Sequence, residues 1–141
     1  MSFFIGPDLT AAQLAASIAR ADQGVAPSRI QLFDNEQPAG GAAAGVTPQA
    51  EIILSKPCGS VVGAALVLTP ADAGGSMVLR TGIPRWARWL SGDGKIMADG
   101  LVTDADHGGA FQVSGGATTP GDTSPSLYAG GLVLLGGTSF T

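Results

Sequence analysis

Apolar residues recur at helical spacing near the start of the chain. The stripe consists of Leu14, Ile18, Ala21 and Val25, within a run rich in alanine, the strongest helix former. Thr10 and Gln13 fit a capping box that satisfies the first backbone donors of a helix, and Gly24 is a suitable C-terminal cap. The pattern therefore predicts one α-helix over residues 9–22.

From residue 28 onward the pattern changes to short apolar runs separated by Gly, Pro, Asn and Asp. Residues 29–33 alternate between apolar and polar, whereas residues 60–68 are apolar on both faces, as in a buried strand. Strands are expected at residues 29–33, 51–54, 60–68, 77–81, 84–90, 95–102, 111–113, 127–135 and 138–140. Many short strands without alternating helices are typical of a sandwich or a barrel.

The expected fold is therefore mainly β, an antiparallel β-sandwich or barrel-like domain with one N-terminal α-helix. A chain of 141 residues is long enough for one domain and too short for two of ordinary size. We expect an N-terminal arm and helix over residues 1–27 and a β-sandwich domain over residues 28–141, together forming a single structural domain.

The strongest hairpin signal is the Asp-Gly pair at residues 93–94. This pair is favoured in a type I′ turn, in which both central residues take positive φ. A two-residue loop at this point places Leu90 opposite Met97 and Arg88 opposite Asp99. Because a one-residue slip would move every side chain to the other face, burial holds the register. The sequence thus predicts a cross-strand ion pair between Arg88 and Asp99.

The composition indicates a surface that is covered in an assembly. Charged residues make up only 13% of the chain, and its mean hydropathy is +0.30. Soluble domains carry about 25% charged residues, because bare apolar patches associate. We therefore expect a homo-oligomer, with the loop at residues 115–126 among its contacts. The other interface candidates are Phe3, Phe4, Ile5, Trp86 and Trp89.

The three consecutive apolar residues near the N-terminus have two possible destinations. Phe3, Phe4 and Ile5 can reach a partner surface, or they can staple the helix onto the β domain of their own chain. Burying each of these side chains contributes about 1.5–3 kcal/mol in either case. The sequence leaves both alternatives open.

Charge and length argue against several classes of partner. The net charge is −4 and the pI about 4.6, without a basic stripe, so no nucleic-acid partner is expected. No apolar run approaches the roughly 18 residues needed to cross a bilayer, so no membrane contact is expected either. The first residues also lack the basic and apolar regions of a secretory signal.

Few residues suggest a catalytic, metal-binding or ligand-binding site. Asp104, Asp106 and His107 could together hold a divalent cation, but Asp and His before Gly-Gly are also ordinary turn formers. Cys58 is the only cysteine and is interpreted as a small buried hydrophobe. No cofactor, metal site or catalytic residue is expected, and the chain is interpreted as a non-enzyme. Stacking of sugar rings would need exposed aromatic side chains, and the candidates for it are Trp86, Trp89 and Tyr128.

Several motifs of this sequence resemble a small β-rich structural (virion) protein of tailed bacteriophages. The matching runs are RIQLFDNEQP, WARWLSGDGKIMADGLV and LYAGGLVLLGGTSFT. The family pattern has an early strand with a D-x-x-x-P turn, a W-x-R hairpin with one D-G turn and a second D-G in the return strand, then an apolar strand with a Thr/Ser-rich end. Here these positions are Asp34 and Pro38, Trp86 and Arg88, Asp93 and Gly94, Asp99 and Gly100, and Ser139 and Phe140.

The resemblance implies a virion component assembled in the host cytoplasm. Its partners would be other virion proteins, either the major capsid protein or tail and neck proteins. The expected role is a capsid decoration or minor capsid protein, with a tail, baseplate or neck (head–tail connector) subunit as the alternative. A carbohydrate-binding or adhesion module is the alternative from another class. The segment 104–126 is longer and richer in glycine than the family pattern.

Overall fold

The computed structural model of the chain describes residues 3–118 and 120–136. Within them the chain forms α1 (Pro7–Ala21), β1 (Arg29–Phe33), β2 (Ala50–Val62), β3 (Ala65–Pro70), β4 (Ser76–Met77), β5 (Trp86–Leu90), β6 (Ile96–Thr103), β7 (Phe111–Ser114) and β8 (Leu132–Leu135). The strand expected at residues 138–140 lies outside the described residues. No helix in the described part is long and apolar enough to cross a membrane.

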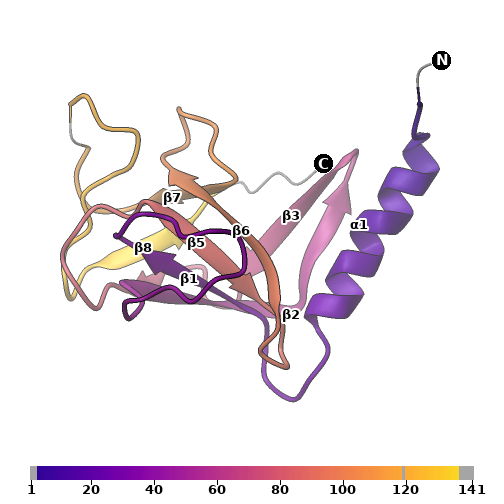
Figure 1. The fold of residues 1–141 in the computed structure, drawn as a ribbon, viewed down its shortest axis with the longest axis horizontal. Coiled ribbons are helices and arrows are strands. Elements are labelled where there is room, and N and C mark those ends of the chain that lie inside the picture. Colours follow the sequence, from indigo (N-terminus) through magenta and orange to yellow (C-terminus); the bar gives the residue numbers. More distant parts are fainter. Residues whose placement is uncertain (1–2, 119, 137–141) are drawn as a thin grey trace.

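The strands form one sheet that curls on itself (Figure 1). Their order is β3-β2-β1-β5-β6-β7-β8-β4, and only β6 and β7 pair in parallel. After β4, Val78 bridges to Ala50 at the start of β2, and the Leu79 amide donates to the Gln49 carbonyl at 2.8 Å. The fold is mainly β and barrel-like with one N-terminal helix, as predicted. A single mixed sheet replaces the two facing sheets of a sandwich.

The barrel interior is filled by alternate side chains of its strands, because successive residues of a strand point to opposite faces. Strand β5 is the exception, since all five of its residues are buried. Ala87 and Trp89 belong to the interior core. Trp86 and Arg88 lie on the outer face, where they bond to residues of the segment 34–48 that joins β1 to β2. This segment forms a second layer over β5.

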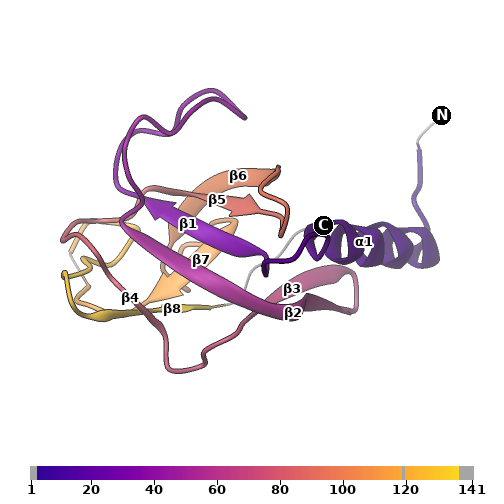
Figure 2. The ribbon, with the colours of Figure 1, turned by 90° about the horizontal axis from the view of Figure 1, so that it is seen from below.

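A helix-covered ribbon extends from the barrel (Figures 1 and 2). The run at residues 60–68, predicted as one buried strand, is instead a hairpin between β2 and β3, which turns at Gly63 with φ +60°. Glycine accepts this φ without strain, as the first position of a type II′ turn requires. One face of the ribbon packs against α1, whose Leu14 joins the same core as Leu66 of β3. The opposite face leaves Val62 61% exposed.

The predicted helix is present but begins earlier than expected. Gly6 is the N-cap, Pro7 occupies the first position, where its missing N–H costs nothing, and no side chain caps the helix. The Thr10 hydroxyl bonds back to the Gly6 carbonyl at 3.3 Å from inside the first turn. The predicted capping box is therefore wrong. The helix ends at Ala21, with Asp22 as its C-cap.

The hairpin between β5 and β6 has a different turn from the predicted one. Asp93 does not take positive φ, whereas Gly94 does (φ +83°), and the Gly94 amide donates to the Ser91 carbonyl. This pattern fits a three-residue loop closed by glycine rather than a type I′ turn. Leu90 consequently faces Ile96, and a bulge restores the predicted register one residue further from the turn. The predicted pairing of Leu90 with residue 97 is wrong.

Candidate functional site

The N-terminal arm, residues 3–6, extends away from the rest of the chain. Phe3 is 88% exposed and Phe4 is 82% exposed, while Ile5 is 40% exposed. Gly6 has extended backbone angles, so the arm leaves the helix without folding back along it. The two aromatic side chains therefore do not staple α1 to the β domain, which was one of the two alternatives from the sequence. They are free to contact another surface.

A second exposed apolar surface lies on the outside of β4 and β8, and we call it the β4–β8 face. It consists of Met77, Leu79, Leu132 and Leu134. Met77 pairs directly opposite Leu132, whereas the intervening residues Val78 and Val133 point inward and are buried. The sequence did not reveal this face, because the run at residues 127–135 is apolar on both sides. Only the pairing shows which leucines point outward.

The prediction that Trp86 and Trp89 belong to an interface is wrong. Trp86 is fully buried, and Trp89 is 3% exposed. The Trp86 ring stacks on Phe33 at a centroid distance of 4.4 Å, and the Trp89 indole N–H donates to the Ser28 hydroxyl at 2.7 Å. Neither ring is available to a partner or a sugar ring, because each is packed inside its own chain. Tyr128, the third candidate for sugar stacking, is 52% exposed.

The Arg88–Asp99 pair is present in the predicted register and is almost completely buried. The guanidinium donates to both carboxylate oxygens, at 2.8 and 3.1 Å. It also donates to the Ala42 carbonyl at 2.5 Å, and the Gly41 amide donates to Asp99 at 3.1 Å. Burial alone would raise the pKa of Asp99, but the hydrogen bonds from Arg88 and Gly41 outweigh it and lower the pKa. The pair thus holds the segment 34–48 onto β5 and β6.

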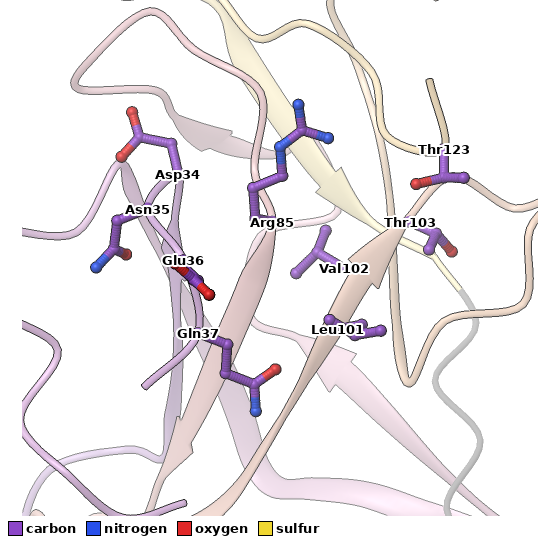
Figure 3. Close-up of a pocket in the computed structure, with 9 residues that line it drawn as sticks. All are labelled: Asp34, Asn35, Glu36, Gln37, Arg85, Leu101, Val102, Thr103 and Thr123. Atoms are coloured by element: carbon purple, nitrogen blue, oxygen red, sulfur yellow. The ribbon is translucent and has the colours of Figure 1, made fainter. Parts of the chain in front are cut away.

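A groove of about 630 Å³ runs between the start of that segment and β6 (Figure 3). Two of its three charged side chains form ion pairs with residues that do not line the groove. Asp34 forms an ion pair with Arg80 at 2.6 Å, and Arg85 forms one with Asp122 at 2.8 Å. The groove therefore lacks a convergent pair of free charges for acid–base chemistry. Its lining residues are Asp34, Asn35, Glu36, Gln37, Arg85, Leu101, Val102, Thr103 and Thr123.

The Asp104, Asp106 and His107 cluster forms a turn. The Asp104 carboxylate accepts the Asp106 amide at 3.0 Å and lies 2.6 Å from Nδ1 of His107. These contacts, the one to His107 above all, lower the pKa of Asp104. Among the residues that the structure describes, no group of three His, Cys, Asp or Glu side chains is placed to hold a metal ion. The Asp104 carboxylate is used in holding the turn itself.

Cys58 is buried, as predicted, and reinforces the contact between β2 and the end of α1. Its amide donates to both carboxylate oxygens of Asp22, at 3.1 and 3.2 Å. Burial, together with the nearby Asp22 charge, raises the pKa of the Cys58 thiol to about 12. Since the thiolate is the nucleophilic form, this thiol is inert near neutral pH.

The loop at residues 115–126 is tied to its own barrel rather than lying free. Ala117 and Ser126 bridge each other, and the buried Ser124 hydroxyl donates to the Val102 carbonyl at 2.6 Å. The Asp104 amide donates to the Thr123 carbonyl at 2.8 Å. The second half of this loop, predicted to take part in oligomer contacts, is therefore held in place by its own chain.

Comparisons with protein-family models, with curated proteins and with solved structures found no match to this chain.

Proposed function

We propose that this chain is a non-enzymatic structural component of a bacteriophage particle, acting as a decoration or minor protein of the capsid. The observation that carries the proposal is the exposure of Phe3 and Phe4 on an arm that extends from the fold. The low charge of the chain and the resemblance of its hairpin to small virion proteins support the same role. A subunit of a shell meets these conditions, because its apolar surfaces are covered after assembly.

An isolated molecule would leave the Phe3 and Phe4 side chains in water. Burying two phenylalanine side chains contributes about 3–6 kcal/mol, at 1.5–3 kcal/mol each. A monomer that keeps both in solvent forgoes that energy and risks nonspecific association. An assembly protein recovers it at a defined contact. The second class considered from the sequence, a carbohydrate-binding module, loses its main support because Trp86 and Trp89 are buried.

Quantitative mass spectrometry of purified phage particles tests the proposal. A copy number comparable to that of the major capsid protein is expected for a shell component. A copy number equal to one symmetric ring would instead place the chain in the neck or tail, which is the alternative within the same class. Absence of the chain from intact particles that are produced while it is expressed would overturn the proposal.

A variant that lacks residues 2–5 connects the proposal to the arm. Gly6 stays in place as the N-cap of α1, and the Phe3 and Phe4 side chains are largely exposed, so the variant should unfold at about the same temperature as wild type. It should be depleted from particles, because its assembly contact is lost. A charge-preserving control is Val25→Ser, which removes a fully exposed apolar side chain in the loop after the C-terminal end of the helix. Equal incorporation of the deletion variant and the wild-type chain would contradict the role of the arm.

A further inference from the structure

We propose that the N-terminal arm of one copy docks on the β4–β8 face of a second copy. In this arrangement each copy gives one arm and receives one, so the copies form a closed dimer or ring. The inference rests on the proposed structural function, and it names the contact that such a function would use. It follows from the chemistry of the two surfaces, from their positions and from the area that they can bury.

The β4–β8 face has the chemistry of a site for an apolar segment. Met77 and Leu132 lie side by side on paired strands and are more than half exposed, and Leu79 follows on the same face. Leu132 and Leu134 border Gly75, which has no side chain to fill the space between them. No charged residue occurs in the two runs SMVL and LVLL that build the face. A charged or polar partner would lose hydration on this surface without finding a partner group.

The arm is apolar and uncharged, like the β4–β8 face. Phe3, Phe4 and Ile5 are consecutive, and the first charged side chain after them is Asp8, in the first turn of α1. In an extended segment successive side chains point to opposite sides, so Phe3 and Ile5 can enter the face together. The arm and the face are thus two uncharged apolar surfaces of the same chain.

A chain cannot place its own arm on its own face. Figures 1 and 2 both show the N-terminal end of α1 directed away from the barrel, with β8 on the opposite side of the molecule, and Figure 2 shows β4 beside β8. The helix has 15 residues and so extends about 22 Å, at 1.5 Å per residue. The four residues of the arm reach at most about 14 Å when fully extended. The arm is too short to return along its own helix, so the receiving face belongs to another molecule.

The area of one contact indicates a closed assembly. An aromatic side chain buries about 150–250 Å², so two large side chains of one arm with their receiving surface remove roughly 600–1,000 Å² from water. Stable interfaces bury about 1,200–2,000 Å². One arm contact falls below that range, whereas the two contacts of a reciprocal dimer lie in one interface and together reach it. Head-to-tail closure in a ring also gives each copy two contacts, but it places them in two separate interfaces.

Analytical ultracentrifugation of the purified full chain tests the contact with three variants. Phe3→Ser/Phe4→Ser removes the arm surface, and Leu132→Lys places a charge on the face. Both should sediment as 14.0 kDa monomers at concentrations where wild type is assembled. The matched control is Leu101→Lys, which changes a residue of similar exposure on β6 and should leave the assembly intact. Because all these side chains are exposed, near-ultraviolet circular dichroism should show an unchanged fold.

Disulfide trapping identifies the partners directly. A Phe3→Cys chain mixed with a Leu132→Cys chain should form a disulfide-linked dimer on mild oxidation, whereas Phe3→Cys with Leu101→Cys should not. The native Cys58 does not compete, because it is buried. A monomeric wild type, or an assembly that survives both variants, would overturn the inference. Loss of assembly in Leu101→Lys alone would overturn it too, because the contact would then lie at the groove that Leu101 lines.

These results are separable from those for the proposed function. If the disulfide links the arm to the face but the chain is absent from phage particles, the virion role is wrong and the proposed contact stands. Normal incorporation of Leu132→Lys into particles would remove the contact and keep the virion role.

Discussion

The two faces of β5 are equally buried but are held by different forces. On the inner face, Ala87 and Trp89 join the apolar core of the barrel. On the outer face, Trp86 stacks against Phe33, and the Arg88 guanidinium lies 5.2 Å from the centre of the Trp86 ring. A substitution on the inner face lowers the free energy of unfolding in proportion to the packing that it removes. The outer face contains a buried charge, so its stability depends on every partner being present.

The covering layer explains this difference. The loop at residues 39–45 contains only alanine and glycine, so it offers no large apolar side chain to anchor it. Its attachment comes from Arg88, which bonds to the Ala42 carbonyl, and from Asp99, which accepts the Gly41 amide. The ion pair therefore replaces the hydrophobic anchor that the loop lacks. Changes on the outer face should detach the loop as well as lower the overall stability.

The largest effect is expected for Asp99→Ala. The change leaves the Arg88 charge buried without its carboxylate, which should lower the free energy of unfolding by about 3–5 kcal/mol. Urea denaturation measures the loss, and limited proteolysis should show new cleavage within residues 39–45. A variant as stable as wild type would show that the buried pair is not needed.

A double substitution separates the charge from the packing. Arg88→Met/Asp99→Leu removes both charges while keeping apolar volume, and replacing a buried ion pair in this way is often neutral or stabilising. It should recover most of the stability that Asp99→Ala loses. The loop should nevertheless remain sensitive to protease, because Ala42 and Gly41 still lack their partners.

A smaller effect is expected for Asn35→Ala. The Asn35 side chain accepts the Trp86 indole N–H at 2.9 Å and donates to the Ala44 carbonyl at 2.9 Å. Its loss leaves a buried donor unsatisfied, which should cost about 1–3 kcal/mol. The change in unfolding free energy should be accompanied by a shift in tryptophan fluorescence. Asn35→Asp, which keeps the acceptor and loses the donor, should recover the Trp86 contact and leave the Ala44 carbonyl free.

The same contrast explains how much of this molecule could be predicted. The pairing of Arg88 with Asp99 was predicted correctly although the turn was not, because the bulge between Trp89 and Leu90 offsets the longer loop. Burial of one face holds that register. The second layer could not be predicted, since the backbone of an alanine- and glycine-rich loop carries its contacts. Trp86 was misassigned for the same reason, because without that layer the outer face of β5 would be exposed. Trp89 instead packs in the core of the barrel.

Non-local pairing was also hidden from the sequence. The parallel contact between β6 and β7 joins Val102 to Phe111, and no local pattern indicates its direction. The run at residues 60–68 gave a misleading signal, because its apolar residues serve the helix on one face and lie in solvent on the other. Gly63, at the centre of that run, was the signal for a turn that the apolar pattern obscured.

A pH titration sharpens the contrast, because only the outer face contains an ionised carboxylate. Hydrogen bonds from Arg88 and Gly41 overcome the effect of burial and hold the pKa of Asp99 below its ordinary value of 3.8. The stability from a lowered carboxyl pKa is fully present above about pH 4 and is lost as the pH falls through the folded-state pKa. The stability gap between wild type and Asp99→Asn should therefore be constant above about pH 5 and narrow toward about pH 3. A gap of constant size throughout would contradict this assignment.

The smallest effect is expected for Arg85→Ala, and it tests whether burial, rather than pairing as such, gives Arg88 its importance. Arg85 donates to both carboxylate oxygens of Asp122, at 2.8 and 3.2 Å, so its geometry is close to that of Arg88 with Asp99. The difference is exposure, which is 47% for the Arg85 side chain and 8% for Arg88. An exposed pair contributes about 0–1 kcal/mol, and about 1 M salt reduces the screening length to roughly 3 Å. The loss in Arg85→Ala should therefore disappear at high salt, whereas the loss in Asp99→Ala should persist, because salt does not reach a buried charge. If the two losses fell together with added salt, solvent would have access to the outer face of β5, and the comparison between its two faces would fail.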